Sequence, residues 1–235
     1  MDRLLRNYMN RFFGYGSWNA PYWFIGIEEA DCGEPITDRL ERWRRRDCSD
    51  LEDFAQFHEN TQHCRFIGKK PAYQRTWGSL VKIFLSFKGV DWDKATVLDF
   101  QGNTFARRNK EVAAIDLFPL PSRSVNHWSY RTQFANVPFL KSRELYEHTL
   151  FPRRQRVLNR RIQQYKPKLV VFYSKTYSDL AEGVAGVNLA QSSCADCLEG
   201  ANAATFFFVC RLRRPSDESL RKIGLYLRGQ TAINK

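Results

Sequence analysis

The chain has 235 residues, of which 43% are hydrophobic and 14% aromatic, so it can bury a sizeable core and is not globally disordered. Its 37 Lys and Arg against 25 Asp and Glu give a formal net charge of +12, which favours a polyanionic partner, most often nucleic acid. No apolar run reaches membrane-spanning length and no signal segment is recognisable, so we expect a cytoplasmic protein with no membrane partner.

The first third of the chain reads as a helix, a buried strand and two further helices. Apolar residues recur at helical spacing over 2–13. The run from Tyr22 to Gly26 is continuous and uncharged, which is typical of a strand buried on both faces, and Glu28 and Glu29 follow it directly. Helices are expected at about 38–46 and 50–58.

The middle of the chain contains one long amphipathic helix and a second buried strand. Apolar positions share one stripe over 72–87, and a variable basic loop is expected after it. The strand Val112–Leu117 carries Asp116 near its end. The sequence Phe-Pro-Leu-Pro-Ser follows, and its prolines prevent helix or ladder continuation, so a rigid loop must leave this strand.

The last third predicts a basic helix over 138–165, a strand at 167–173, a short helix at 176–182, a strand at 204–210 and a final helix at 216–228. Four apolar strands alternating with helices indicate an α/β fold with a parallel sheet covered on both faces. No linker-like stretch or repeat divides the chain, so we expect one domain over 1–235, and a monomer.

Six scattered cysteines do not suggest a disulfide framework in a chain of this length. Cys194 and Cys197 have metal or redox spacing, but a zinc site needs two more ligands. His63 and Cys64 could supply them; the simpler interpretation is two small residues in a loop. We therefore expect no metal and no cofactor.

Distinctive groups follow three of the four expected strands. Glu28 and Glu29 follow the first, Asp116 ends the second, and Arg213-Arg214-Pro215-Ser216 follows the fourth, just before a helix. Parallel strands bring their carboxyl ends to one edge of the sheet, where open α/β folds bind ligands. A helix N-terminus there suits phosphate.

These motifs resemble the uracil-DNA glycosylase superfamily. Gly26-Ile27-Glu28-Glu29-Ala30 corresponds to that family's motif after its first strand, Arg214-Pro215-Ser216 to its His-Pro-Ser motif, and Asp116 to its base-reading residue. The resemblance implies a three-layer α/β/α sandwich with a central four-stranded parallel sheet. The chain departs from the pattern, because Glu28 replaces Asn or Asp, Glu29 a proline, Ala30 a glycine and Arg214 a histidine. The cysteine framework of the iron–sulfur branch is absent.

The resemblance implies a monofunctional DNA glycosylase that flips a base and hydrolyses its N-glycosidic bond, leaving an abasic site. Such a bond breaks through an oxocarbenium-like sugar, which Glu28 could stabilise while orienting the attacking water. Arg214 could stabilise the anion that develops on the departing pyrimidine. Glu29 is the second candidate acid, although its motif position belongs to a loop proline.

Asp116 carries the prediction of base preference. An ionised carboxylate only accepts hydrogen bonds, so it suits the N4 amino group of cytosine and repels O4 of uracil. We therefore expect a modified cytosine, such as hydroxymethyl- or glucosyl-hydroxymethylcytosine in phage DNA, and a role in antiviral defence. The alternative is that Asp116 caps the following loop and reads nothing.

The other expected site residues surround the flipped nucleotide in duplex or single-stranded DNA. Gly26 and Ile27 would line the base pocket, and Phe118 would stack on the base. Phosphate contacts are expected from Arg123, Arg131, Arg213 and Ser216.

Three alternatives remain open. The chain could repair uracil or damaged bases, could be a catalytically weak DNA-binding module on the same fold, or could be a small-molecule enzyme with an incidental basic surface.

Overall fold

The computed structural model describes residues 2–124, 126–174, 177–194, 196–212 and 214–233. Its helices, including two short 3-10 turns (η1 and η2), are distributed along the whole chain. They are α1 (Asp2–Arg11), α2 (Ile36–Arg45), α3 (Phe54–Phe57), η1 (Gln62–Phe66), α4 (Arg75–Lys88), α5 (Lys94–Asn103), α6 (Tyr130–Gln133), η2 (Pro138–Leu140), α7 (Arg143–Tyr165), α8 (Ser178–Ala185) and α9 (Asp217–Ile233).

Within these residues, eight strands form one mixed sheet in the order β3-β1-β4-β2-β5-β8-β7-β6. The strands are β1 (Gly14–Tyr15), β2 (Tyr22–Gly26), β3 (Leu51–Glu52), β4 (Val112–Asp116), β5 (Leu169–Phe172), β6 (Ala190–Gln191), β7 (Leu198–Ala201) and β8 (Phe206–Val209).

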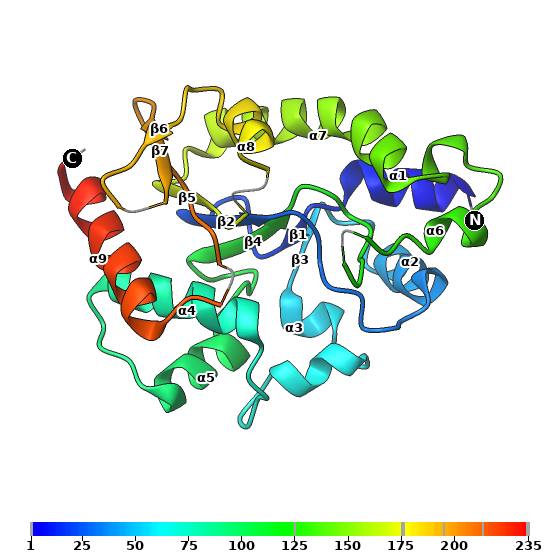
Figure 1. Cartoon of the computed structure of the whole chain (residues 1–235). Helices are drawn as coiled ribbons and strands as arrows, with labels where there is room; N and C mark the ends of the chain where they lie inside the picture. The colour runs from blue at the N-terminus through cyan, green and yellow to red at the C-terminus, as the bar shows by residue number, and fades with distance from the viewer. Residues whose placement is uncertain (1, 125, 175–176, 195, 213, 234–235) are drawn as a thin grey trace.

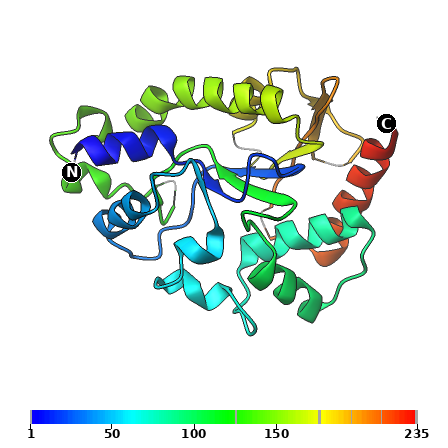
Figure 2. The ribbon, with the colours of Figure 1, turned by 180° about the vertical axis from the view of Figure 1, so that it is seen from behind.

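The four apolar strands expected from the sequence form the middle of this sheet. β4, β2, β5 and β8 pair in parallel in that order, and every residue of β2 is buried. A strand with a neighbour on each side and helices on each face exposes no side chain to water. This burial explains the uninterrupted apolar run of β2. Helices α1, α7 and α8 lie over one face, and α4, α5 and α9 over the other (Figures 1 and 2).

The expectation of a four-stranded, wholly parallel sheet is wrong at both edges. β1 pairs antiparallel with β4 on one side, and β7 pairs antiparallel with β8 on the other. β1 and β3 have only two residues each, too few to show an alternating pattern. β6 and β7 are half-buried or exposed and contain few apolar residues, so they give little hydrophobic signal.

Two segments between β2 and β4 also differ from expectation. The helix expected at 50–58 is split into β3 and the single turn of α3, which Asp53 caps by accepting from the amides of Ala55 and Gln56. The expected variable loop contains α5, whose N-cap Asp93 accepts from the Thr96 amide at 2.8 Å. Among the described helices, none has the length and hydrophobicity needed to cross a bilayer.

The connections define where the sheet can bind a ligand. The chain leaves β2 toward β4 on one side and β5 toward β8 on the other. The resulting switch point lies between the carboxyl ends of β2 and β5, where open α/β sheets form a crevice. Residues after β2 and β4 stay paired beyond this edge, since Phe118 N donates to Ile27 O at 2.7 Å and Ser122 N donates to Glu29 O at 3.1 Å.

Candidate functional site

A cavity of about 270 Å³ opens at this carboxyl edge and is called the strand-end cavity below. It is lined by residues of β4, residues that follow β2, β5 and β8, residues around the start of α4, and one residue each from β1 and η1. They are Tyr15, Ile27, Glu28, Glu29, Ala30, His63, Gln74, Thr76, Trp77, Ala114, Asp116, Tyr173, Ser174 and Leu212.

A larger hollow of about 470 Å³ lies at the opposite, amino-terminal edge. It is lined by residues at the starts of strands, including Tyr22, Lys168 and Phe206. None of the site residues expected from the sequence lines it. The strand-end cavity is therefore the candidate functional site.

Glu28 is held by a bidentate ion pair with Arg143, the first residue of α7. The guanidinium donates to Oε1 at 2.9 Å and to Oε2 at 2.7 Å, and the Glu28 side chain is 8% exposed. Burial raises the pKa of Glu28, with Arg143 opposing that rise. The pair fixes the carboxylate at the cavity wall, as a positioned acid or base requires.

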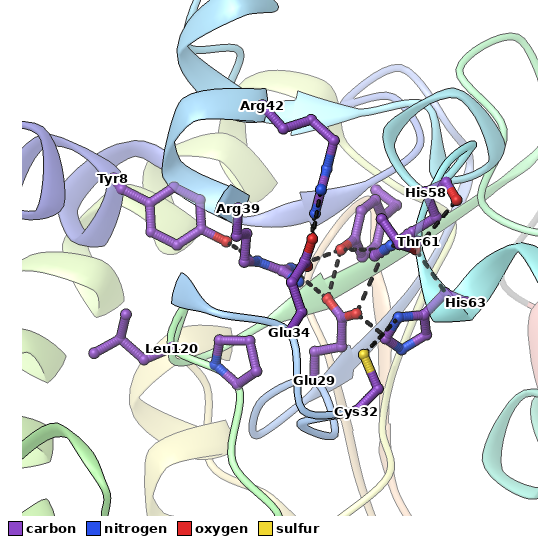
Figure 3. Close-up of polar contacts among 12 residues, drawn as sticks. Tyr8, Glu29, Cys32, Glu34, Arg39, Arg42, His58, Thr61, His63 and Leu120 are labelled. Carbon is purple, nitrogen blue, oxygen red and sulfur yellow. Dashed lines mark hydrogen bonds and ion pairs between the residues drawn. The ribbon is translucent and has the colours of Figure 1, made fainter. Parts of the chain in front are cut away.

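Glu29 is the centre of a buried polar network (Figure 3). Its Oε2 accepts from Tyr15 Oη and from Arg39 Nη2, both at 2.5 Å. Arg39 also donates to Tyr15 Oη at 2.8 Å and to Tyr8 Oη at 2.7 Å. Burial acts to raise the pKa of Glu29, but Arg39, together with His58 and His63, outweighs burial and holds that pKa well below its usual range.

The second oxygen of Glu29 faces two imidazoles. Oε1 lies 3.4 Å from His58 Nε2 and 3.3 Å from His63 Nε2, yet it is buried and has no hydrogen-bond partner among the described residues. Burial lowers the pKa of His58 well below its usual range and also lowers that of His63. Burial therefore favours the neutral form of both rings, in which one ring nitrogen donates and the other accepts.

Asp116 lies beside this network, with its backbone held on both sides. Its amide donates to Phe13 O at 2.8 Å and its carbonyl accepts from Arg154 Nη2 at 2.9 Å. Its register partner is Gly26, so the carboxyl stands next to the end of β2. Burial, reinforced by the Glu29 carboxylate, raises the pKa of Asp116 well above its usual range. Burial thus acts against the ionised form of Asp116 on which the expected cytosine preference depends.

Aromatic rings form part of the cavity wall, but Phe118 does not. Phe118 is 0% exposed and packs against Tyr146 and Phe151, so its ring cannot meet a base. Trp77 and Tyr173 line the cavity instead. Tyr173 crosses the end of β2 over Gly26, where an added Cβ would lie 2.0 Å from Tyr173 Oη.

Arg214 lies in a separate hollow that adjoins the start of α4. Tyr73, Arg75 and Lys82 also line that hollow. Arg214 does not line the strand-end cavity. Ser216 acts as a helix cap, because its Oγ accepts from the Ser219 amide at 3.1 Å. The structure thus does not bring Arg214 and Glu28 into one cavity.

The remaining expected phosphate contacts are at the surface. Arg131 is exposed, and Arg123, 64% exposed, lies 3.4 Å from Asp31 in an ion pair. Arg213 lies outside the described residues. Of the two residues expected to line the base pocket, Ile27 lines the cavity, whereas Gly26 does not and lies beneath Tyr173 at the end of β2.

Sequence reasoning missed Tyr15, Arg39, His58 and Arg143, and it considered His63 only as a possible zinc ligand beside the Cys194 and Cys197 pair. His58 follows a single helical turn and His63 lies in η1, so no periodic pattern surrounds them. One signal was present: two of the four histidines of the chain lie five positions apart, among aromatic residues. Among the described residues, Glu29, His58 and His63 place three possible metal-ligand atoms within 4.8 Å of one another. The Cys194 and Cys197 pair belongs to no such group of three.

In comparison with known proteins, no family model matches the chain and no curated protein matches it in sequence.

Proposed function

We propose that the chain is a DNA glycosylase that hydrolyses the N-glycosidic bond of a flipped, modified pyrimidine and leaves an abasic site. The favoured substrate is a modified cytosine of phage DNA, such as hydroxymethyl- or glucosyl-hydroxymethylcytosine. The three-layer sandwich of the uracil-DNA glycosylases and a cytoplasmic role in defence belong to the same proposal. One observation carries it: Glu28 and Asp116 line one cavity at adjacent strand ends.

The cavity suits one base better than a large ligand. A volume of about 270 Å³ is at the small end of ligand pockets. Trp77 and Tyr173 offer aromatic surface, and Gln74, Thr76 and Ser174 offer polar groups. A base in a duplex must leave the stack to reach such a pocket.

Glu28 is the proposed acid beside the scissile bond. Its carboxylate can stabilise the positive charge that develops on the sugar and orient the attacking water. Arg143 fixes its orientation while leaving lone pairs on both oxygens for a water. Glu29 remains the second candidate, because its Oε1 has no donor in the described structure.

We assign Arg214 a different role from the one its motif position implies. Arg75, Lys82 and Arg214 line one hollow beside the cavity. A phosphate flanking a flipped nucleotide would meet these cations there. Support for a leaving-group role is weak, because Arg214 does not reach the cavity that holds Glu28.

Base release from a panel of duplexes tests the proposal. Each duplex carries one uracil, cytosine, hydroxymethylcytosine or glucosyl-hydroxymethylcytosine, and alkali cleavage reports abasic sites. We expect release of a modified cytosine, and a loss of at least ~100-fold in rate for Glu28→Gln with DNA affinity retained.

Glu34→Gln is the matched control. Glu34 forms a similar bidentate pair with Arg42, at 2.5 and 2.7 Å, but does not line the strand-end cavity. We expect it to keep wild-type base release. Release of uracil alone would contradict the cytosine preference, and equal rates for the two variants would contradict the role of Glu28.

A DNA-binding module without chemistry is the second candidate function. The observation that favours it is that Arg143 donates to both Glu28 oxygens, because this ion pair makes the carboxylate a weaker base. This alternative predicts tight DNA binding and no alkali-labile sites on any duplex of the panel.

A further inference from the structure

The buried network around Glu29 leaves one carboxylate oxygen without a donor and places two imidazole nitrogens beside it. His58 Nδ1 lies 3.2 Å from Thr61 Oγ1, a hydroxyl that accepts from or donates to the ring according to the tautomer of His58. When Thr61 Oγ1 donates to the His58 carbonyl, at 3.1 Å, it accepts from Nδ1. In that tautomer, Nε2 presents a lone pair.

In this tautomer, no described residue directs a proton at that lone pair. Tyr15 Oη lies 2.8 Å from His58 Nε2, but its proton is donated to Glu29 Oε2 at 2.5 Å. Glu29 Oε1, the other neighbour of Nε2, is buried and has no hydrogen-bond donor among the described residues. Buried acceptors that face one another are costly unless a proton donor or a cation lies between them.

The spacing of these atoms matches that of ligands around one ion. Glu29 Oε1 is 3.4 Å from His58 Nε2 and 3.3 Å from His63 Nε2, and all three atoms lie within 4.8 Å of one another. Ligands about 2.0–2.1 Å from a tetrahedral zinc ion are about 3.3–3.5 Å apart. The carboxylate side chain is 7% exposed, so water does not freely solvate it.

We propose that Glu29 Oε1, His58 Nε2 and His63 Nε2 bind one divalent transition-metal ion such as Zn²⁺, with a further coordination position open to the strand-end cavity. Two imidazoles and one carboxylate are the ligand set of many zinc sites that keep an open position. Glu29 and His63 line the cavity, so water or a ligand can reach the ion.

The surrounding residues orient each ligand, as outer-shell partners of metal sites do. Thr61 holds His58 Nδ1, and Cys32 Sγ lies 3.4 Å from His63 Nδ1 (Figure 3). Arg39 and Tyr15 occupy Oε2 of Glu29 and leave Oε1 for the ion. The proposal is independent of glycosylase activity, because it concerns binding alone.

Metal titration of the full chain tests the site. Protein dialysed against a chelator is titrated with Zn²⁺ by calorimetry and with Co²⁺ by visible absorption. We expect one ion per chain, d–d bands of a low-symmetry Co²⁺ site, and an increase in Tm with Zn²⁺. His63→Gln should weaken binding more than ~100-fold, beyond the 10–100-fold typical of outer-shell changes.

The other two histidines provide the controls. His127 and His148 are exposed, and His127→Gln and His148→Gln should bind as the wild type does. Cys194→Ser should also leave binding unchanged. Wild-type protein that binds no ion, or binding that His63→Gln retains and Cys194→Ser abolishes, overturns the proposal.

A measurement on the unaltered chain covers the case in which His63→Gln does not fold. The chain has four histidines, so its imidazole NMR signals are few. We expect one equivalent of Co²⁺ to shift or broaden two of the four sets, those of His58 and His63. Perturbation of His127 or His148 instead would place the ion elsewhere and contradict the site.

Discussion

The burial of Asp116 bears on which base the proposed site would recognise. Burial raises its pKa and so favours the neutral acid, which can donate through its hydroxyl as well as accept through its carbonyl. The neutral form is complementary to N4 and N3 of cytosine, and equally to O4 and N3 of uracil. Discrimination between the two bases therefore depends on ionisation, since only the carboxylate repels O4.

This dependence predicts a base preference that changes with pH. The folded-state pKa of Asp116 is raised, so the neutral form persists below it and the carboxylate appears as the pH rises through it. Release of a cytosine derivative relative to uracil should therefore increase toward alkaline pH. Single-turnover rates on two matched duplexes, at several pH values, measure this ratio.

Asp116→Asn is the control, because an amide donates and accepts at every pH. Its ratio of cytosine-derivative to uracil release should be flat across the same range. An identical pH slope in this variant would show that another group sets the preference.

The three acids were predictable because they follow strands that the sequence makes obvious. Glu28, Glu29 and Asp116 come directly after or at the end of fully apolar runs, and parallel strands gather such positions at one edge. His58 and Arg143 were not predictable in this way. They lie on segments far from those strands in sequence, and only tertiary packing brings them to Glu29 and Glu28.

At the scale of elements, β2 must end in a residue without a side chain. Tyr173, which follows β5, crosses Gly26 so closely that a Cβ there would lie 2.0 Å from its hydroxyl. The ring also lines the cavity, so this contact links the packing of β2 and β5 to the shape of the site. We expect Gly26→Ala to displace Tyr173.

Overpacking of this kind costs about 1–3 kcal/mol, and urea unfolding should show a loss of that size in the free energy of unfolding. Gly229→Ala is the matched control. Gly229 lies within α9 and an added Cβ there would meet no atom within 4 Å. Alanine favours a helix over glycine by up to about 1 kcal/mol, so Gly229→Ala should be neutral or stabilising. Equal losses in both variants would rule out the contact with Tyr173 as the cause.

The hydrophobic pattern of the sequence predicted the strands that contain long apolar runs and did not predict the short strands that lack such runs. β2, β4, β5 and β8 each bury all or nearly all of their residues, and their sequences show it. β1 forms because its backbone lies between β3 and β4, a condition that a pair such as Gly14–Tyr15 does not reveal. β1 nevertheless matters to the site, since it carries the Tyr15 that binds Glu29.

At the scale of the whole molecule, much of the positive charge is neutralised within the fold. Arg39, Arg42 and Arg143 are each paired with a glutamate in buried or half-buried positions. If the chain binds DNA as proposed, we expect the contacts to come from cations near the carboxyl edge of the sheet that remain exposed. Arg214 is such a cation, beside Arg75 and Lys82.

The two roles considered for Arg214 predict different effects of its removal. Arg214→Asn is the appropriate variant, because the φ of 52° at this position lies in the left-handed region that asparagine tolerates. If Arg214 contacts a phosphate, the variant should weaken DNA binding and lower the slope of log K against log salt by about one, while single-turnover base release at saturation stays unchanged. If Arg214 instead stabilises the departing base, the single-turnover rate of base release at saturation should fall, and the slope of log K against log salt should remain unchanged.

Arg160→Ala tests whether position, and not merely charge, decides the outcome. Arg160 is exposed near the end of α7 that leads into β5, so it lies toward the amino-terminal edge of the sheet, away from the cavity. Both variants remove one positive charge, and long-range attraction for DNA should fall equally in each. A reduced salt slope in Arg214→Asn alone would place a phosphate at Arg214. An equal reduction of the salt slope in both variants would show that Arg214 contributes only through the net charge of the protein. A fall in the rate of base release at saturation would show that Arg214 acts in the chemical step.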